Sequence, residues 1–183
     1  MPGRISGLVA LAIAATLASG AVSAAEGYGF GRPATPQEIA GWDIDVSPSG
    51  AGLPPGQGDV QQGAAIFADK CAGCHGAHGE GEPMDRLVGG IGTLRDKKPE
   101  KTVGSFWPYA TTLFDFVRRA MPLNAPQSLT PDEVYAVSAY VLFLNGIVPQ
   151  DTTLDADTLA KIRMPNRDGF VSAFPTPASA PKP

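Results

Sequence analysis

Five consecutive residues, Cys71-Ala72-Gly73-Cys74-His75, constrain this chain more than any other part of its sequence. They form a C-x-x-C-H pattern, which is the attachment signature of c-type haem. Two thiols spaced by two residues can each form a thioether with a haem vinyl group, and the histidine that follows then lies under the iron as an axial ligand. Cys71 and Cys74 are the only cysteines, so none is left for another purpose. The pattern predicts one covalently bound haem c.

Other uses of a C-x-x-C pair explain this sequence less well. A structural zinc site normally needs four Cys or His ligands, and the four present here fall within eight residues, too close for paired hairpins. A thioredoxin-like redox pair needs a βαβ context, whereas the flanks of this pair predict a helix and a Gly-rich loop. A simple disulfide gives no reason for the adjacent His75.

The second axial position of the iron is predicted to be taken by Met121. His78 is the only other histidine, and three residues of chain span at most about 10.5 Å, barely enough to pass around a porphyrin to its far face. The remaining candidates are the methionines, Met1, Met84, Met121 and Met164. Met121 lies between two predicted helices, just before the helix break at Pro122, although any methionine can instead fill a core. A His75/Met121 pair raises the reduction potential and closes both axial positions, which favours electron transfer over oxygen or peroxide chemistry.

The N-terminus predicts export, because residues 1–24 have the parts of a secretory signal. Arg4 supplies the positive charge, an uncharged apolar run extends from Leu8 to Leu17, and Val22-Ser23-Ala24 fits a small-residue cleavage site. The apolar run is short for a membrane span of roughly 20 residues. Cleavage near Ala24 is therefore favoured over a membrane anchor, and we expect a periplasmic protein with no membrane span after cleavage.

Charge argues against one class of partner. The formal net charge is −4, which gives no general electrostatic reason for nucleic-acid binding. Lys97, Lys98 and Lys101 could steer an acidic redox partner. The alternative is an ordinary solvated surface, since Asp96 and Glu100 are interleaved with these lysines.

Composition divides the rest of the chain into three segments. Residues 25–58 are rich in Gly and Pro and form an arm. Residues 59–148 contain the C-x-x-C-H pattern and the strongest helix signals, so they are the predicted haem domain. Residues 149–183 form a C-terminal extension that ends in a Pro-rich tail, which is predicted to be loose.

One short helix is predicted within the arm. Thr35-Pro36-Gln37-Glu38 has capping-box spacing with Pro at the first helical position, and the helix should end at Ala40. Trp42 to Val46 then alternates apolar and acidic residues, as a half-buried extended segment does. Two interpretations of Trp42 are open: its ring folds back onto the domain, or it docks a partner.

The haem domain contains three predicted helices, at residues 59–70, about 107–121, and 131–145. Asp59 can cap the first helix. Gly63 lies inside that helix at a cost of about 1 kcal/mol relative to Ala, which favours the close approach of another backbone. The third helix has a capping box at Thr130-Pro131-Asp132-Glu133 and is apolar almost all round, so burial is predicted. A further short helix, capped by Thr152 or Thr153, is expected before residue 164.

The order helix, C-x-x-C-H, loop, helix, methionine, capped helix resembles a class I cytochrome c, which implies an all-α fold around one haem. In that family the first and last helices cross at a Gly and aromatic pair, which corresponds to Gly63 and Phe67 with Tyr140 opposite. Longer runs between about Tyr28 and Phe170 resemble the cytochrome c subunit (SoxD type) of bacterial sulfane dehydrogenase. These runs are Gly41–Val46, Leu87–Leu94, Lys101–Asp115, Arg119–Pro122 and Pro165–Phe170.

This resemblance implies an electron-transfer subunit for sulfur-compound oxidation, not an enzyme in its own right. In that family the cytochrome partners a molybdopterin subunit of the sulfite-oxidase type, which oxidises sulfite or protein-bound sulfane sulfur. The cytochrome carries the electrons away to a downstream cytochrome or oxidase of the respiratory chain. Some members carry two haems, whereas this chain has one attachment motif and resembles a single-haem form.

Two other functions stay open. The chain can be a general soluble electron carrier for a terminal oxidase, in which case its arm is merely structural. It can also be a haem enzyme such as a thiosulfate dehydrogenase or a peroxidase. Such enzymes usually need a second haem or an unusual ligand such as Cys, and this chain has neither to spare.

Overall fold

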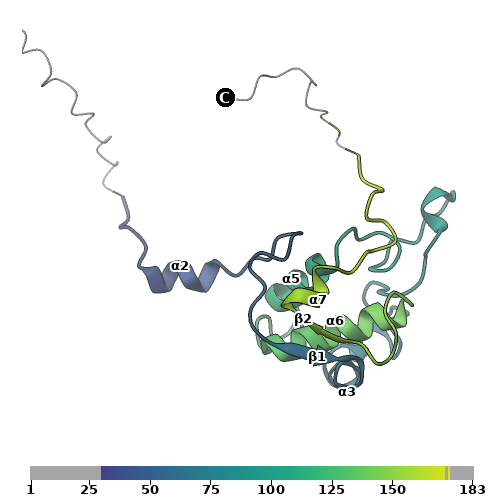
Figure 1. The fold of residues 1–183 in the computed structure, drawn as a ribbon, viewed down its shortest axis with the longest axis horizontal. Coiled ribbons are helices and arrows are strands. Elements are labelled where there is room, and N and C mark those ends of the chain that lie inside the picture. Colours follow the sequence, from purple (N-terminus) through teal and green to yellow (C-terminus); the bar gives the residue numbers. More distant parts are fainter. Residues whose placement is uncertain (1–29, 172, 174–183) are drawn as a thin grey trace, which may run out of the picture. The chain divides into compact units, whose positions relative to one another are not determined.

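The computed structural model describes residues 30–171 and 173, so the predicted signal peptide and the prolines from Pro175 onward lie outside the described residues. The described residues fall into two units, one up to Ile39 and one from Ala40 onward. The fold is mostly helical (Figure 1), which confirms the predicted fold class. In chain order its elements are α2 (Pro36–Trp42), β1 (Gln57–Asp59), α3 (Val60–Lys70), α4 (Ala72–His75), a 3-10 turn (Thr93–Arg95), α5 (Ala110–Ala120), α6 (Pro131–Leu144), β2 (Thr153–Asp155) and α7 (Ala156–Leu159).

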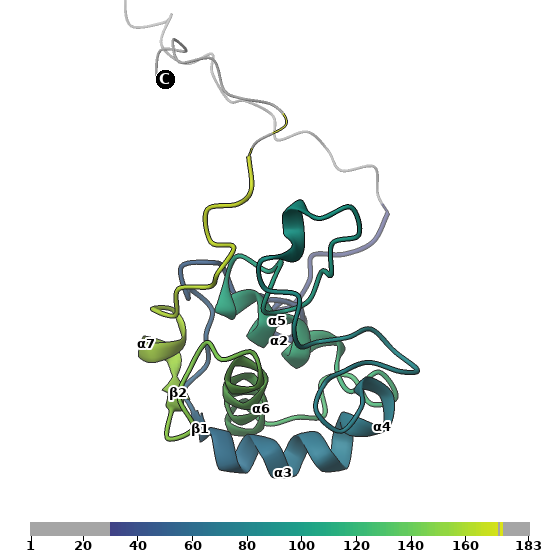
Figure 2. The ribbon, with the colours of Figure 1, turned by 90° about the vertical axis from the view of Figure 1, so that its right-hand side faces the viewer.

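Helices α3 and α6 cross in backbone contact at Gly63. A Cβ added at Gly63 would lie 1.9 Å from the carbonyl oxygen of Ala136, a distance that no side chain can occupy. One turn later the rings of Phe67 and Tyr140 are 5.4 Å apart and inclined by 59°. Figure 2 views α6 nearly along its axis and shows α3 crossing beside it. The predicted Gly and aromatic crossing is therefore confirmed.

Both crossing helices begin with the predicted type of cap. The Asp59 carboxylate accepts from the amide of Gln62 at 2.8 Å, and the Gln62 side chain accepts from the amide of Asp59 at 3.0 Å. At α6 the Thr130 hydroxyl accepts from the amide of Glu133 at 3.3 Å, and the Glu133 carboxylate accepts from the amide of Thr130 at 2.8 Å. Each box satisfies amides that a helix N-terminus otherwise leaves unpaired. Glu133 also pairs with Lys70 at the end of α3, at 2.8 Å.

A short antiparallel ladder between β1 and β2 corrects the prediction for the C-terminal extension. Neither Thr152 nor Thr153 caps a helix there, because Thr153 belongs to β2. The cap of α7 is Asp155, whose carboxylate accepts from the amide of Thr158 at 2.8 Å. Strand pairing is favoured over a helix that begins at Thr152 or Thr153, because the pairing buries the side chain of Leu154, which is 1% exposed.

The helix of the arm is longer than predicted. It begins after Thr35 but continues through Gly41 to Trp42 instead of ending at Ala40. Trp42 is 89% exposed, which contradicts the interpretation that its ring folds back onto the domain. The predicted alternation of apolar and acidic residues begins after Trp42 and reaches Val46, which is buried.

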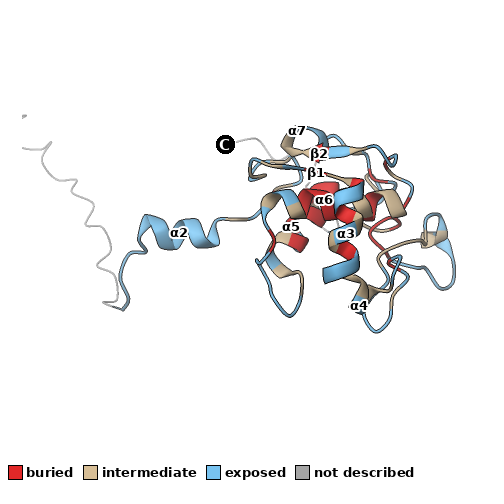
Figure 3. Cartoon of the chain, turned by 90° about the horizontal axis from the view of Figure 1, so that it is seen from below, coloured by how far each residue is buried: buried red, intermediate tan, exposed pale blue. Residues whose placement is uncertain are grey.

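The hydrophobic core lies chiefly between α5 and α6, where Figure 3 shows the buried residues concentrated. Phe114 of α5 and Tyr135 of α6 are 0% exposed, and their rings are 4.5 Å apart. Leu159 and Met164 join the same core from beyond residue 148. The C-terminal extension thus contributes side chains to the core of the helical unit.

Replacing Gly63 by Ala tests the helix crossing. The Gly63→Ala variant should lose about 2 kcal/mol or more of unfolding free energy, because overpacking at a backbone contact outweighs the helix propensity of alanine. Denaturant unfolding measures this loss. Gly41→Ala is the matched control, since Gly41 is also helical and a Cβ added there meets nothing within 4 Å. Equal stability of both variants would show that the crossing does not require glycine.

Candidate functional site

The C-x-x-C-H residues form a single turn attached to the end of α3. The amide of Cys71 donates to the carbonyl of Phe67 at 2.9 Å, and the amide of His75 donates to the carbonyl of Cys71 at 3.0 Å. Neither thiol is in a disulfide; Cys71 is half-buried and Cys74 is exposed. The backbone therefore presents two thiols and one imidazole from adjacent positions.

The state of the Cys71 thiol disfavours the alternative uses of the pair. Burial raises the pKa of Cys71 to about 11. Reactive redox thiols have a lowered pKa instead. Within residues 30–171 and 173, no group of three His, Cys, Asp or Glu side chains is placed to hold a metal ion. The raised pKa of Cys71 thus disfavours a reactive, thioredoxin-like pair.

The ring of His75 is held in one orientation by a backbone carbonyl. Its Nδ1 lies 2.8 Å from the carbonyl oxygen of Asp85. A carbonyl oxygen can only accept, so Nδ1 is the donor in this contact, and in the neutral imidazole the free lone pair then lies on Nε2. Histidines that bind metals in proteins almost always make this kind of second bond. The contact was not foreseen from the sequence, because any residue can supply a backbone carbonyl.

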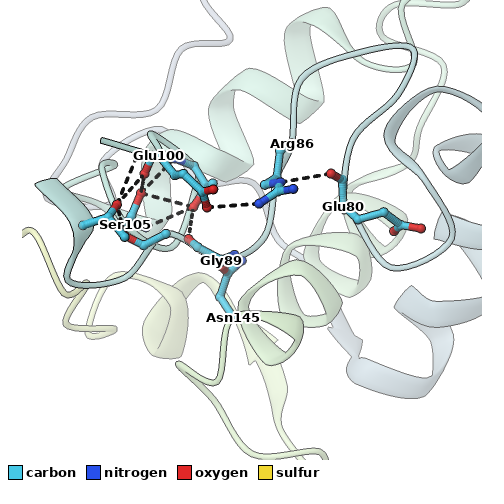
Figure 4. A network of polar contacts seen from close by, with 9 residues as sticks. Glu80, Arg86, Gly89, Glu100, Ser105 and Asn145 are labelled. Carbon is cyan, nitrogen blue, oxygen red and sulfur yellow. Dashed lines mark hydrogen bonds and ion pairs between the residues drawn. The ribbon is translucent and has the colours of Figure 1, made fainter. Parts of the chain in front are cut away.

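The side chain of Arg86, next to Asp85, holds this part of the loop. Its Nε donates to the carbonyl of Glu80 at 3.0 Å, and its Nη1 donates to the carboxylate of Glu100 at 3.0 Å (Figure 4). These bonds join the loop that follows His75 to the segment that precedes α5. They fix the backbone on both sides of the Asp85 carbonyl.

Asn145, at the end of α6, organises the Gly-rich run that begins at Leu87. Its Oδ1 accepts from the amide of Gly89 at 3.1 Å, and its Nδ2 donates to the carbonyls of Leu87 at 3.2 Å and Val141 at 2.9 Å. Thr102 adds a bond from its hydroxyl to the carbonyl of Gly89 at 2.6 Å. The sequence predicted Asn145 only as a helix end. The sequence feature that points to a further role of Asn145 is its position directly after a long apolar helix.

Met121 directly follows α5, and its amide donates to the carbonyl of Val117 at 3.1 Å. It is half-buried and packs against the same core as Cys71. Met164 is 1% exposed and is used by the core, whereas Met84 is 45% exposed on the loop after the motif. Of the described methionines, Met121 alone is half-buried at the edge of the core.

These residues fit a covalently bound haem. Two free thiols, an imidazole with a free Nε2 and a thioether form the donor set. Half-buried apolar residues at the edge of the core accompany them and can cover an apolar macrocycle. They include Ala72, Leu87, Trp107, Met121 and Tyr140.

Comparison with known proteins agrees with a covalently bound haem c. The cytochrome c family model matches residues 60–145. The crystal structure of the sulfane dehydrogenase SoxCD from Paracoccus pantotrophus contains a chain that superposes with a TM-score of 0.74 at 46% identity, covering 79% of this chain and 71% of that chain. This likeness confirms the resemblance predicted from the longer sequence runs.

A second relative is more distant. The thiosulfate dehydrogenase of Stutzerimonas stutzeri (strain A1501) is 29% identical over 131 residues, which are 71% of this chain. This chain spans only 40% of the length of that relative. In the part of the chain that the structure describes, no helix combines the length and apolar character needed to traverse a bilayer.

Replacing Asn145 by Ala tests how the Gly-rich loop is held. The Asn145→Ala variant should lose about 1–3 kcal/mol of stability, because the half-buried amide of Gly89 loses its acceptor. Hydrogen exchange at the Gly89 amide should accelerate in the same variant. Asn124→Ala is the control, since Asn124 is exposed. Unchanged exchange at Gly89 would contradict the assigned role of Asn145.

Proposed function

Because this chain belongs to the cytochrome c family, we propose that Cys71 and Cys74 attach one haem c and that His75 and Met121 are its axial ligands. The family implies covalently bound haem c, and the single attachment motif supports a count of one. When bound, haem supplies a one-electron ferric/ferrous couple. The Asp85 carbonyl orients the ring of His75, and His75 and Met121 would hold the iron.

The chain serves as a periplasmic electron-transfer subunit in sulfur-compound oxidation. It accepts electrons from a molybdopterin subunit of the sulfite or sulfane dehydrogenase type and passes them to a downstream cytochrome or oxidase. The likeness at 46% identity to a chain of SoxCD carries this proposal. The signal-like residues 1–24 support the periplasmic location.

The likeness to thiosulfate dehydrogenase favours a second candidate, in which this chain oxidises thiosulfate itself. That relative is more than twice as long as the matched part, since this chain covers 40% of it. Both cysteines of this chain are already used by the predicted haem attachment, so none is available as an unusual iron ligand. We therefore favour electron transfer over catalysis.

Mixing the purified, haem-loaded chain with a molybdopterin dehydrogenase of the sulfite-oxidase type separates the two candidates. Absorption spectra should show reduction by sulfite only when the dehydrogenase is present. The cytochrome without the dehydrogenase should not turn over thiosulfate with an artificial electron acceptor. Turnover of thiosulfate by the cytochrome alone would overturn the electron-transfer proposal.

The Met121→Ala variant tests the second axial ligand. It should lose the ferric absorption band that reports sulfur-to-iron ligation. Its reduction potential should fall by about 0.1 V or more, within the range of about 0.8 V that axial ligands set. Met84→Ala is the matched control and should keep both properties, because Met84 lies on the exposed loop. Unchanged spectra and potential in Met121→Ala would rule out Met121.

A further inference from the structure

The inner part of the arm is bonded along one face of α5. This segment, Ile44–Pro48, is called the strap below. The Arg118 guanidinium donates to the carbonyl of Ile44 at 3.0 Å, and the amide of Val46 donates to the carboxylate of Asp115 at 2.8 Å. The Thr111 hydroxyl donates to the carbonyl of Pro48 at 3.4 Å.

The three strap partners on α5 share one side of the helix. Their spacings of four and then three residues place Thr111, Asp115 and Arg118 one above the other. The strap therefore follows the axis of α5 for two turns instead of touching it at a single point.

Asp115 is the buried centre of this contact. Its side chain is 12% exposed, and it forms an ion pair with Arg119. The Arg119 Nε donates to the same carboxylate at 3.1 Å, and Asp115 raises the pKa of Arg119. A buried carboxylate needs such partners. Removing Asp115 would leave the buried amide of Val46 without an acceptor.

The remaining face of α5 packs into the core through Leu113, Phe114 and Val117, which are all buried. Helix α5 is thus held between the core on one side and the strap on the other. The next residue after its last turn is Met121, whose amide bonds to the carbonyl of Val117. Any shift or rotation of the helix end displaces the thioether of Met121.

We propose that the strap positions Met121 as an iron ligand, with Asp115 as the positioning residue that transmits the constraint through α5. This inference rests on the proposed function, because it takes Met121 as the second axial ligand. Groups bonded directly to a metal ligand typically change metal affinity or activity by about 10–100-fold when they are removed; Asp115 acts one step further away, through α5.

Imidazole titration of the haem-loaded ferric protein measures how firmly Met121 is held, because imidazole must displace it from the iron. Asp115→Ala should bind imidazole about tenfold more tightly than the parent, equivalent to about 1.4 kcal/mol. Hydrogen exchange at the Met121 amide should accelerate, a readout independent of the iron. Asp115→Asn keeps an acceptor for the amide of Val46 and should recover most of both effects.

Arg118→Leu is the second variant, for use if Asp115→Ala does not fold. It removes the donor to the Ile44 carbonyl and keeps the buried carboxylate. Loss of one such hydrogen bond should strengthen imidazole binding about threefold. If neither of the folded variants changes its affinity for imidazole, the proposal is overturned.

Tyr135→Phe controls for general destabilisation. The Tyr135 hydroxyl donates to the carbonyl of Pro54 at 2.9 Å, so it attaches the same N-terminal segment to α6 instead of α5. The Tyr135→Phe variant should lose stability while its imidazole affinity and Met121 exchange stay at the parent values. If Tyr135→Phe strengthens imidazole binding as much as Asp115→Ala, the effect is global and the inference is wrong.

The Met121→Ala variant, measured in the same titration, distinguishes a failure of the strap inference from a failure of the proposed axial ligand. Stronger imidazole binding in Met121→Ala together with unchanged binding in Asp115→Ala would refute the strap and leave Met121 as the ligand. Unchanged binding in Met121→Ala would refute the axial assignment and the inference with it. Stronger binding in both variants, with Tyr135→Phe at the parent value, supports both statements.

Discussion

The backbone contact between Gly63 of α3 and Ala136 of α6 is the constraint on which the site depends. Cys71 follows the end of α3, and Asn145 follows the end of α6. The angle and depth of the crossing therefore set where the thiols lie relative to the loop that Asn145 holds. A side chain at position 63 would force the helices apart and would separate these two parts of the site. The Phe67–Tyr140 ring contact, one turn further on, keeps the crossing from sliding.

Each candidate iron ligand is fixed by a different kind of partner. The ring of His75 is oriented by a backbone carbonyl, which has no charge and does not titrate. Met121 is instead placed by the end of a helix that the core and the strap hold from two sides. A thioether has no proton and no strong hydrogen bond through which neighbours could orient it. Its position must therefore come from packing and from the backbone, which explains why a distant carboxylate such as Asp115 can matter for it.

Local signals in the sequence predicted most of the helices, and they are also the basis of the proposed donor set. Capping boxes, Pro122 and Gly63 act through neighbours in sequence or through a steric limit, so their consequences can be derived without a structure. The ladder of β1 and β2 could not be predicted in this way, because it joins segments far apart in the chain and contains only three residues per strand. The carbonyl of Asp85 carries no side-chain signature at all. The sequence carries no signal for the role proposed for Asp115, because the strap residue that contacts it, Val46, lies 69 residues earlier in the chain.

The likeness to a chain of SoxCD covers 79% of this chain, and the likeness to a thiosulfate dehydrogenase covers 71% of it. Because these two proteins are named for different sulfur compounds, the likenesses do not specify which compound is oxidised. Catalysis at the iron needs an axial position that substrate can reach. Under the proposed assignment, attachment would consume both cysteines, and His75 and Met121 would hold the iron. If both residues hold the iron, the site is suited to moving electrons, and the proposed function then places the oxidation of the sulfur compound on a partner.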